Sequence, residues 1–404
     1  MIAAPAWLLD LTRAIARLDR GPLTGIDRVE LAYLRYLLAR PEPMFALVRT
    51  GLGFVLLGRT GAQGILGRMT GQVPLGRADL LGLLTQRHVP QRVQAEADAR
   101  RLSIARCLPM RLGTMLRSAL PKGTVYVNVG HANLTERVIR AVKSMPEARM
   151  VVMVHDTIPL EYPQFCRAGV PADFSRKVGL VSANADLVVH TADCTRAVTE
   201  VHFGKAGRVP AGVTAPLGVE IVPPDAQDVG DLKRPYYVAL GTIEPRKNIG
   251  FLLQVWAELQ KATPPAPHLY IVGNRGWAAP AVFDQLDAVA ASGAITLLHR
   301  YDDASVAALL QGAEALLFPS LAEGYGLPPI EAAALGVPVM SSKLPVVEET
   351  LGDYPVYLDT SDVYAWVAAI NHQMRHWKQT PDAQRQIRVP PSWVDHFDRV
   401  FGKV

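Results

Sequence analysis

Two glutamates, Glu323 and Glu331, lie at the two ends of a glycine-containing loop, and their spacing is the strongest chemical signal in the chain. The apolar run 315–318 before the loop predicts a buried strand. The proline pair 328–329 after it predicts the first turn of a helix, which Gly336 is expected to end. In an open α/β sheet, ligands bind at the carboxyl ends of the strands, so this loop is expected to face a ligand.

The chemistry of that ligand follows from the groups around the loop. The backbone N–H groups of Gly326 and Leu327 begin the predicted helix, where a phosphate group is readily bound. Carboxylates repel phosphate, so Glu323 and Glu331 make sense as acceptors of hydrogen bonds from hydroxyl groups, which a sugar and a ribose supply. The simpler alternative is that Glu331 interacts with the helix dipole and Glu323 is a solvated loop residue.

The run PSLAEGYGLPPIEAAALGVPV, residues 319–339, resembles the C-terminal signature of retaining glycosyltransferase family four, in which a second glutamate follows the first by eight positions. The resemblance implies a GT-B fold, in which two Rossmann-like domains face a central cleft. It also implies that Glu331 binds the ribose hydroxyls of a nucleotide-diphosphate sugar and that Glu323 binds hydroxyls of the donor sugar.

Two cations follow an earlier predicted strand in the turn GTIEPRKN, residues 241–248. Arg246 and Lys247 could neutralise a diphosphate, the first as a bidentate fork and the second as a point charge. Such a pair on its own is usually a solvated turn. In this position it resembles the phosphate-binding pair of the same glycosyltransferase family.

Three further turns are candidate parts of the nucleotide site, although each could be only a turn. Gly273, Asn274 and Arg275 follow the next predicted strand in VGNRGW. Gly273 would let the chain pass close to a nucleotide, and Arg275 could reach a phosphate or the base. Tyr301 follows a third strand, where the family recognises the base. Gly25 lies in the first glycine turn, at which the family typically has two adjacent glycines.

The N-terminal half offers His155 and Asp156 at the end of the apolar run Met150–Val154. A histidine at a strand end of an α/β sheet is well placed for chemistry. The segment HDTIPLEYP also resembles the family's N-terminal segment, whose histidine reaches the donor sugar near the reacting carbon. His155 is therefore the main candidate, Asp156 its supporting or acceptor-facing neighbour, and His131 a weaker candidate on the acceptor side.

The α/β alternation is interrupted by the polar, proline-rich run Val222–Pro235, which predicts a linker between two domains. We expect an α/β architecture with an acceptor-binding domain at 1–222 and a nucleotide-sugar-binding domain at 223–385. Residues 386–404 are expected to form a terminal helix with apolar positions at helical spacing. The resemblance implies that this helix crosses back to the N-terminal domain.

The chain has 404 residues, of which 49% are hydrophobic and 20% charged, as in a globular protein. No apolar run is long enough to cross a membrane, and residues 1–20 lack the basic leader of a signal peptide. The three cysteines are far apart, which indicates neither a disulfide framework nor a zinc site. We therefore expect a cytoplasmic protein.

The segment 59–122 is an expected basic insertion, largely helical after Leu80, with eleven Arg and Lys against three acidic residues. Such a segment suits an anionic membrane surface, where a lipid-linked saccharide acceptor would be found. A set of solvated helices is the alternative. Nucleic acid is not expected as a partner, because the segment lacks interleaved aromatic residues for stacking on bases.

Together, these patterns predict a retaining glycosyltransferase that moves a sugar from a nucleotide-diphosphate donor to an acceptor hydroxyl. No D-x-D pair occurs, so neither a metal nor a further cofactor is expected. By analogy, the candidate donor is GDP-mannose. Left open are a double displacement through Glu323, a phosphorylase or epimerase reaction, and a non-catalytic protein that binds nucleotide sugar or nucleic acid.

Overall fold

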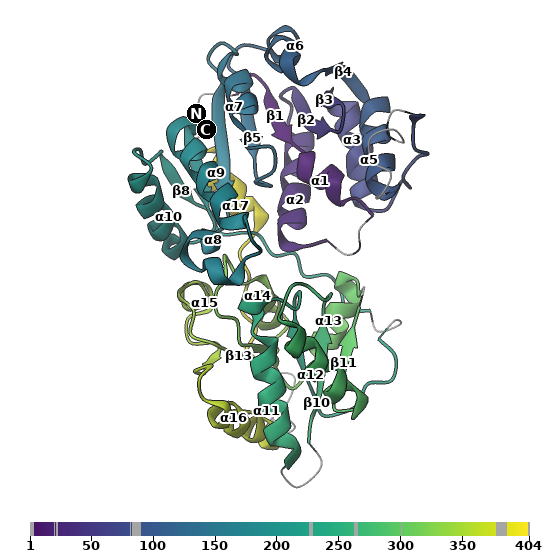
Figure 1. The fold of residues 1–404 in the computed structure, drawn as a ribbon, viewed down its shortest axis with the longest axis vertical. Helices are drawn as coiled ribbons and strands as arrows, with labels where there is room; N and C mark the ends of the chain where they lie inside the picture. Colours follow the sequence, from purple (N-terminus) through teal and green to yellow (C-terminus); the bar gives the residue numbers. More distant parts are fainter. Residues whose placement is uncertain are drawn as a thin grey trace.

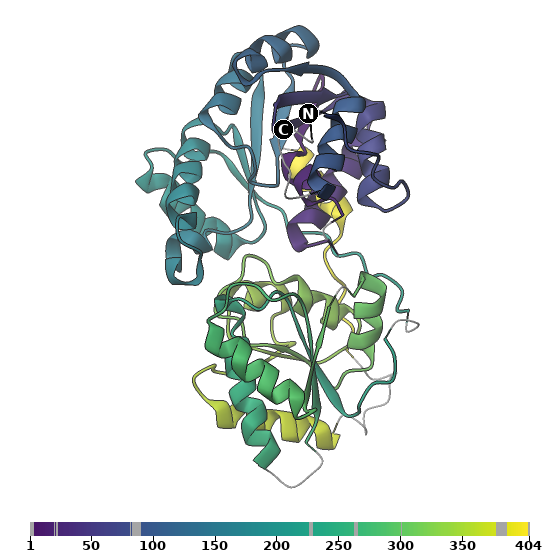
Figure 2. The same cartoon turned by 45° about the vertical axis from the view of Figure 1, so that its right-hand side comes forward.

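The computed structural model contains two β-sheets with helices on both faces, one above the other in Figures 1 and 2. It describes residues 4–19, 21, 23–80, 82, 90–225, 229–261, 266–299, 301–376 and 386–402. We call the first sheet with its helices the N-terminal domain, and the second sheet with its helices the C-terminal domain. Among the helices in these ranges, none has the length and apolarity needed to cross a bilayer.

The first sheet has eight strands in the order β4-β3-β2-β1-β5-β6-β7-β8. β3 runs antiparallel to β2 and β4, and the other neighbours are parallel. The elements are β1 (Trp7–Asp10), α1 (Thr12–Arg17), α2 (Gly25–Ala39), β2 (Met44–Thr50), β3 (Gly53–Leu57), α3 (Arg59–Met69), α5 (Pro90–Arg101), β4 (Ser103–Cys107), η1 (Pro109–Arg111), α6 (Leu112–Ala119), β5 (Val125–Asn128), α7 (Glu136–Lys143), β6 (Arg149–Val154), α8 (Ile158–Glu161), η2 (Pro163–Phe165), α9 (Val170–Asn184), β7 (Leu187–His190), α10 (Asp193–Lys205) and β8 (Gly212–Thr214).

The second sheet is parallel throughout, in the order β11-β10-β9-β12-β13-β14. This is the doubly wound order in which the chain starts at the centre and fills one side before the other. Its elements are β9 (Tyr236–Leu240), η3 (Pro245–Lys247), α11 (Ile249–Lys261), β10 (His268–Val272), α12 (Pro280–Ala291), β11 (Ile295–Leu298), α13 (Asp303–Gln311), β12 (Leu316–Phe318), α14 (Leu327–Ala334), β13 (Val339–Ser341), α15 (Pro345–Leu351), β14 (Val356–Tyr357) and α16 (Val363–His376).

Each sheet separates two apolar cores, because neighbouring side chains of a strand point to opposite faces. In β1, Trp7 and Leu9 contribute to the core with α1, α2, α3 and α5, whereas Leu8 contributes to the core with α6, α7 and α9. In β9, Tyr237 packs with α11 and α16, and Val238 packs with α13. Strands buried on both faces explain the near-continuous apolar runs in the sequence.

The helix α17 (Trp393–Phe401) returns from the C-terminal domain and packs against the N-terminal domain, as the yellow helix in Figure 1 shows. Phe397 stacks on Tyr36 with ring centroids 4.0 Å apart. Phe401 meets the edge of Trp7 at 4.8 Å, so the returning helix completes the core around β1. The predicted crossing of the terminal helix is confirmed.

Two elements depart from the prediction for the basic segment. Helix was expected only after Leu80, but α3 already forms a helix at Arg59–Met69. Ser103–Cys107 was expected within a helical stretch, but it forms the edge strand β4, paired antiparallel with β3. Its residues alternate between half-buried and exposed, so the strand presents only one weakly apolar face. The sequence of such a short edge strand shows little alternation of apolar and polar residues. Its pairing with the neighbouring strand decides its conformation.

Candidate active site

The loops after β9 and β12 lie side by side because these strands are neighbours, with Leu316 opposite Val238. The strand order reverses at this point, and open α/β sheets bind ligands in the crevice that such a reversal creates. The turn after β9 ends in η3, which carries Arg246 and Lys247. The loop after β12 carries Glu323, so the topology brings these three charges to one crevice.

Glu323 is paired with both cations. Its two carboxylate oxygens lie 2.6 Å from Arg246 Nη1 and 2.5 Å from Lys247 Nζ. All three side chains are largely buried, Glu323 being only 8% exposed. Burial opposes its charge, but Lys247 and Arg246 outweigh that effect and hold the pKa of Glu323 below its ordinary value. The carboxylate is therefore ionised at neutral pH, as the partner of both cations.

A second acid and a backbone bond hold Arg246 in this position. Its Nε lies 2.5 Å from Glu244 Oε1. Its carbonyl accepts a hydrogen bond from the N–H of Leu321 at 2.7 Å, which ties the β9 loop to the β12 loop. The guanidinium is thus oriented before any ligand arrives, as electrostatic stabilisation of a developing charge requires.

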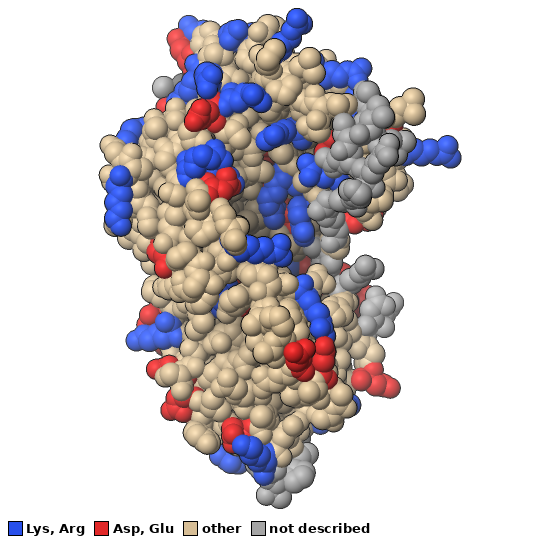
Figure 3. Space-filling model, in the orientation of Figure 1, with Lys and Arg blue, Asp and Glu red and all other residues tan. Residues whose placement is uncertain are grey.

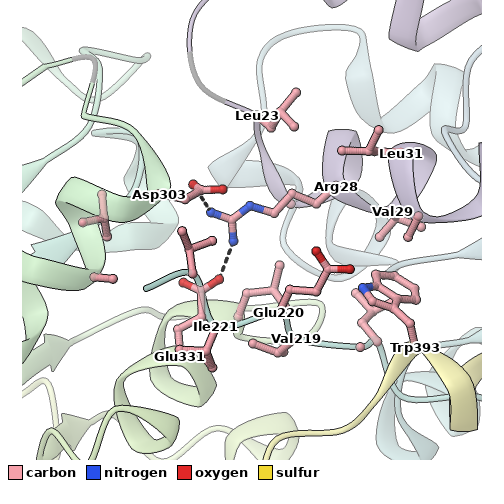
Figure 4. Close-up of a pocket in the computed structure, with 18 of the residues that line it drawn as sticks. Leu23, Arg28, Val29, Leu31, Val219, Glu220, Ile221, Asp303, Glu331 and Trp393 are labelled. Carbon is pink, nitrogen blue, oxygen red and sulfur yellow. Dashed lines mark hydrogen bonds and ion pairs between the residues drawn. The ribbon is translucent and has the colours of Figure 1, made fainter. Parts of the chain in front are cut away.

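Glu331 lies on α14, whose N-cap Gly326 has φ of 84°. Glycine adopts this left-handed conformation without strain. The carboxylate of Glu331 is paired across the domain boundary with Arg28 of α2, which also bonds Asp303 of α13 at 2.5 Å. These three residues line a cavity of about 340 Å³ between the domains (Figure 4). No pattern in the sequence indicated the pairing of Arg28 with Glu331.

His155 directly follows β6, at the carboxyl ends of the parallel strands of the first sheet, and is buried. Its Nε2 lies 2.7 Å from the carbonyl oxygen of Val129. A carbonyl only accepts hydrogen bonds, so Nε2 carries the proton and Nδ1 is the acceptor of the neutral ring. Burial lowers the pKa of His155 to about 4, so at neutral pH the ring is an uncharged hydrogen-bonding group.

Asp156 faces the loop of Glu323 across the domain boundary. A Cβ added to Gly324 would lie 2.8 Å from Asp156 Oδ2 and 2.8 Å from the carbonyl oxygen of His155, so only glycine fits there. Asp156 and Glu323 line a second cavity of about 150 Å³. Burial raises the pKa of Asp156 to about 6, although nearby Arg246 opposes the rise. The structure thus brings His155 and Asp156 beside the Glu323 loop.

Contacts that the sequence did not indicate hold this loop against the N-terminal domain. The carbonyl of Gly324 accepts hydrogen bonds from the hydroxyls of Thr191 and Thr195, each at 3.2 Å. The hydroxyl of Tyr325 donates to the carbonyl of Leu217 at 3.1 Å. No motif marks these residues, because their pairing depends on how the two domains face each other.

A further bridge caps a helix across the boundary. Glu349 of α15 accepts hydrogen bonds from the N–H groups of Asp193 and Cys194, at 2.6 and 2.8 Å. These donors begin α10, where a carboxylate is favoured by the helix dipole. The bridge holds α15 of one domain to α10 of the other.

The turn after β10 carries three further candidates, Gly273, Asn274 and Arg275. Gly273 lies where a Cβ would meet the carbonyl oxygen of Gly241 at 2.0 Å, so the turns after β9 and β10 touch. The carbonyl of Asn274 accepts the N–H of Ile243 at 3.0 Å. The guanidinium of Arg275 pairs with Asp287 of α12.

Tyr301 and Gly25 are placed by apolar contacts. Tyr301 packs against the core between the sheet and α13. Gly25 begins α2, where a Cβ would lie 3.2 Å from Leu327 Cδ1, so the first turns of α2 and α14 meet there.

The basic segment uses part of its charge within the fold. Arg59 donates to the carbonyls of Leu38, Arg40 and Glu42 after α2. Asp98 pairs with two arginines and Asp79 with a third. Lys and Arg side chains nevertheless spread over the N-terminal domain on the face shown in Figure 3. An open groove of about 730 Å³ is lined by five exposed arginines: Arg49, Arg117, Arg137, Arg140 and Arg176.

Among the described residues, no group of three or more His, Cys, Asp or Glu side chains could hold a metal ion. The charged groups of the crevice are instead two cations and the acids that pair with them. Such a set is suited to bind an anionic diphosphate and the hydroxyl groups of a sugar.

Comparison with known proteins adds to this geometry. Residues 225–388 match the family model "Glycosyl transferases group 1". The matched part contains η3, the Glu323 loop and α14, and it is less than half of the chain.

Curated relatives match over a similar length. "O-antigen chain mannosyltransferase B" of Escherichia coli is 33% identical over 151 residues, 37% of this chain and 40% of that protein. "O-antigen chain mannosyltransferase RfbU" of Salmonella typhimurium is 32% identical over 154 residues, 37% of this chain and 40% of that protein. The chain thus spans 40% of the length of these two relatives.

Solved structures match over nearly the whole chain. Anabaena HepE in complex with UDP and glucose has a TM-score of 0.64 at 14% identity and covers 99% of both chains. Sucrose-phosphate synthase from Thermosynechococcus elongatus has a TM-score of 0.60 at 16% identity, covering 98% of this chain and 94% of that one. The predicted GT-B fold, with two Rossmann-like domains, is confirmed.

Proposed function

We propose that the protein is a retaining, metal-independent glycosyltransferase that moves a sugar from a nucleotide-diphosphate donor to an acceptor hydroxyl in bacterial surface polysaccharide assembly. The observation that carries the proposal is the cluster of Arg246, Lys247 and Glu323 at the reversal point of the second sheet, beside His155 and Asp156. The family match over residues 225–388 supports the same reading.

The cluster suits the charge changes of glycosyl transfer. Negative charge develops on the diphosphate as the sugar–phosphate bond breaks, and positive charge develops on the sugar ring. Arg246, Lys247 and the N–H groups at the start of α14 stabilise the leaving diphosphate. The ionised Glu323 accepts sugar hydroxyls and lies close to the developing positive charge.

The N-terminal domain supplies the other wall of the site. His155 is uncharged and keeps Nδ1 as an acceptor for a donor-sugar hydroxyl. Asp156 faces the acceptor side. The departing phosphate takes the proton of the acceptor hydroxyl, so the acceptor approaches from the side that the phosphate leaves. The new bond therefore forms on the same face of the sugar as the bond that breaks, and the configuration at the anomeric carbon is retained. Glu331 accepts the ribose hydroxyls.

Binding of a nucleotide sugar is the first test, with GDP-mannose as the proposed donor because several relatives are named mannosyltransferases. We expect GDP-mannose to raise the melting temperature without added metal, more than UDP-, dTDP- or ADP-sugars do, since a ligand that binds only the folded state stabilises it. Glu331→Ala should abolish the shift and the turnover.

Two outcomes would contradict this assignment. If Glu331→Ala bound and turned over the donor like the wild type, the ribose contact would be misplaced. If no nucleotide sugar shifted the melting temperature and no transfer was detected, a non-catalytic binding protein would be favoured instead. If only a UDP-sugar stabilised the protein, the proposed glycosyltransferase activity would stand, but the donor would be a UDP-sugar and not GDP-mannose.

The basic groove leads to a second proposal, that the N-terminal domain attaches to anionic membranes that hold a lipid-linked saccharide acceptor. Met110 lines the same groove as the arginines and is 91% exposed. We expect salt-sensitive binding to phosphatidylglycerol vesicles, weakened about tenfold in Arg117→Gln/Arg140→Gln. The control Lys261→Gln/Lys343→Gln removes the same charge from the C-terminal domain. Equal weakening by both pairs, or binding insensitive to salt, would reject this surface.

A further inference from the structure

Arg28 joins the two domains at the acid that the proposed function assigns to ribose. It lies on α2, one turn after Gly25, and its two terminal nitrogens bond Glu331 and Asp303. Figure 4 shows its side chain extending across the cavity toward both acids. The partners belong to α14 and α13 of the other domain, so this is an interdomain ion pair inside the cavity.

The surroundings of Arg28 indicate that its ion pair with Glu331 can be broken and replaced by another contact. Its Nε is buried and has no hydrogen-bond partner within the described part of the chain, so this position of the guanidinium leaves a buried donor unsatisfied. Its side chain is 30% exposed and that of Asp303 is 38% exposed, so water reaches the pair. Asp303 would remain as a partner if Arg28 left Glu331.

The same pairing leaves Glu331 less able to bind a nucleotide. Arg28 donates to Oε1 of Glu331, so a ribose that donates one hydroxyl to each carboxylate oxygen competes with Arg28 at Oε1. The first turn of α2 also lies against the first turn of α14, where Gly25 approaches Leu327. Donor entry at α14 therefore competes with α2 and with its arginine.

We propose that Arg28 sets the donor affinity of the enzyme by occupying Glu331 until a nucleotide displaces it. The inference rests on the proposed role of Glu331 in donor binding. Without a donor, Arg28 bridges α2 to Glu331 of α14, and the nucleotide replaces the guanidinium with its ribose hydroxyls. Arg28 then remains paired with Asp303.

The test compares the binding of GDP and UDP to the wild type, Arg28→Gln and Arg92→Gln. Arg92 is the control, because it lies on α5 of the same domain, is not among the residues that line this cavity, and pairs with Glu96 of its own helix at 3.1 Å. If the free site is populated one-tenth of the time in the wild type, Arg28→Gln should lower the Kd about tenfold. Arg92→Gln should leave the Kd unchanged.

A second measurement does not depend on nucleotide. Amide hydrogen exchange in the first turns of α2 and α14 should be faster in ligand-free Arg28→Gln than in the wild type, because the bond between these two helices is lost. Unchanged exchange together with an unchanged Kd would overturn the proposal. A higher Kd in Arg28→Gln than in the wild type would also overturn the proposal, since Arg28 would then be a donor-binding residue.

The failure of this inference and the failure of the proposed function are distinguishable through Glu331→Gln. If Glu331→Gln loses nucleotide while Arg28→Gln binds like the wild type, competition by Arg28 is rejected and the donor site stands. If Glu331→Gln binds nucleotide like the wild type, the assignment of Glu331 fails, and the role of Arg28 fails with it.

Discussion

Glu323→Gln is expected to lower the transfer rate by about 10³-fold, the scale seen when one preorganised polar group is removed from a reacting centre. The carboxylate is the shared partner of Arg246 and Lys247 and the proposed acceptor for donor-sugar hydroxyls. The amide keeps the size of the side chain but removes its charge. Initial rates with saturating donor and acceptor measure the effect on the chemical step.

The same substitution should destabilise the ligand-free protein. Removing one partner of a buried ion pair costs about 3–5 kcal/mol, because the remaining charge stays buried without compensation. Lys247 is the more buried of the two cations and loses its acid. A nucleoside diphosphate would supply new negative charge, so GDP should raise the melting temperature of Glu323→Gln more than that of the wild type.

Glu244→Gln is the matched control, because Glu244 is also buried and its carboxylate pairs with Arg246, whereas the ammonium of Lys247 pairs with Glu323. It should lose stability while keeping far more of the transfer rate. If Glu323→Gln lost stability alone and kept its rate, Glu323 would be a structural acid and the assigned sugar contact would be wrong.

Acidification from pH 6.5 toward pH 5 is expected to lower the free energy of unfolding steeply. Burial lowers the pKa of His155, His190, His268 and His396 to about 4 and that of His131 to about 3. The unfolded chain takes up protons at these positions near pH 6.5, whereas the folded protein does not. Stability is therefore present above pH 6.5 and is lost as pH falls toward 4.

Four buried acids, Asp10, Glu30, Asp156 and Glu244, oppose this trend, because burial raises the pKa of each. Burial raises the pKa of Asp156 to about 6 and that of Glu30 to about 7, so the folded protein binds protons there before the unfolded chain does. The histidines outnumber these acids, which leaves a net uptake of protons on unfolding. We expect a loss of about 2–4 kcal/mol per pH unit, measured from urea midpoints between pH 7.5 and pH 5.

His396→Gln should reduce this slope by about one proton, or roughly 1.4 kcal/mol per pH unit. His396 is fully buried and bonds the hydroxyl of Tyr33 at 2.8 Å. The control His299→Gln replaces an exposed histidine and should leave the slope unchanged. A slope that is equal in the wild type and His396→Gln would show that this ring is not neutral in the folded protein.

The central strands could be predicted from sequence because strands buried on both faces leave near-continuous apolar runs. Met150–Val154, for example, corresponds to β6 and leads directly to His155. The edge strand β4 could not, because its half-buried residues form no such run. Strand identity is local information, whereas the pairing of an edge strand is not.

The candidate site likewise has parts that could be predicted from the sequence and parts that could not. The turns that carry Arg246 and Glu323 were each predicted from a strand end. Their contact depends on β9 lying next to β12, and these strands are far apart in the sequence. The Arg28–Glu331 pair depends on how the two domains face each other, and its residues are separated by 303 positions. No periodicity or spacing in the sequence records such a contact.

The return of α17 has a consequence for how the protein forms during synthesis. The core around β1 contains Trp7 and Tyr33 from one end of the described chain and Phe397 and Phe401 from the other. On the ribosome, the N-terminal domain must therefore wait, with part of this core open, while the whole C-terminal domain is made. The second domain can close its own sheet first, because its cores draw on residues 229–374 alone. The domain that is translated first is thus expected to be the last to finish folding.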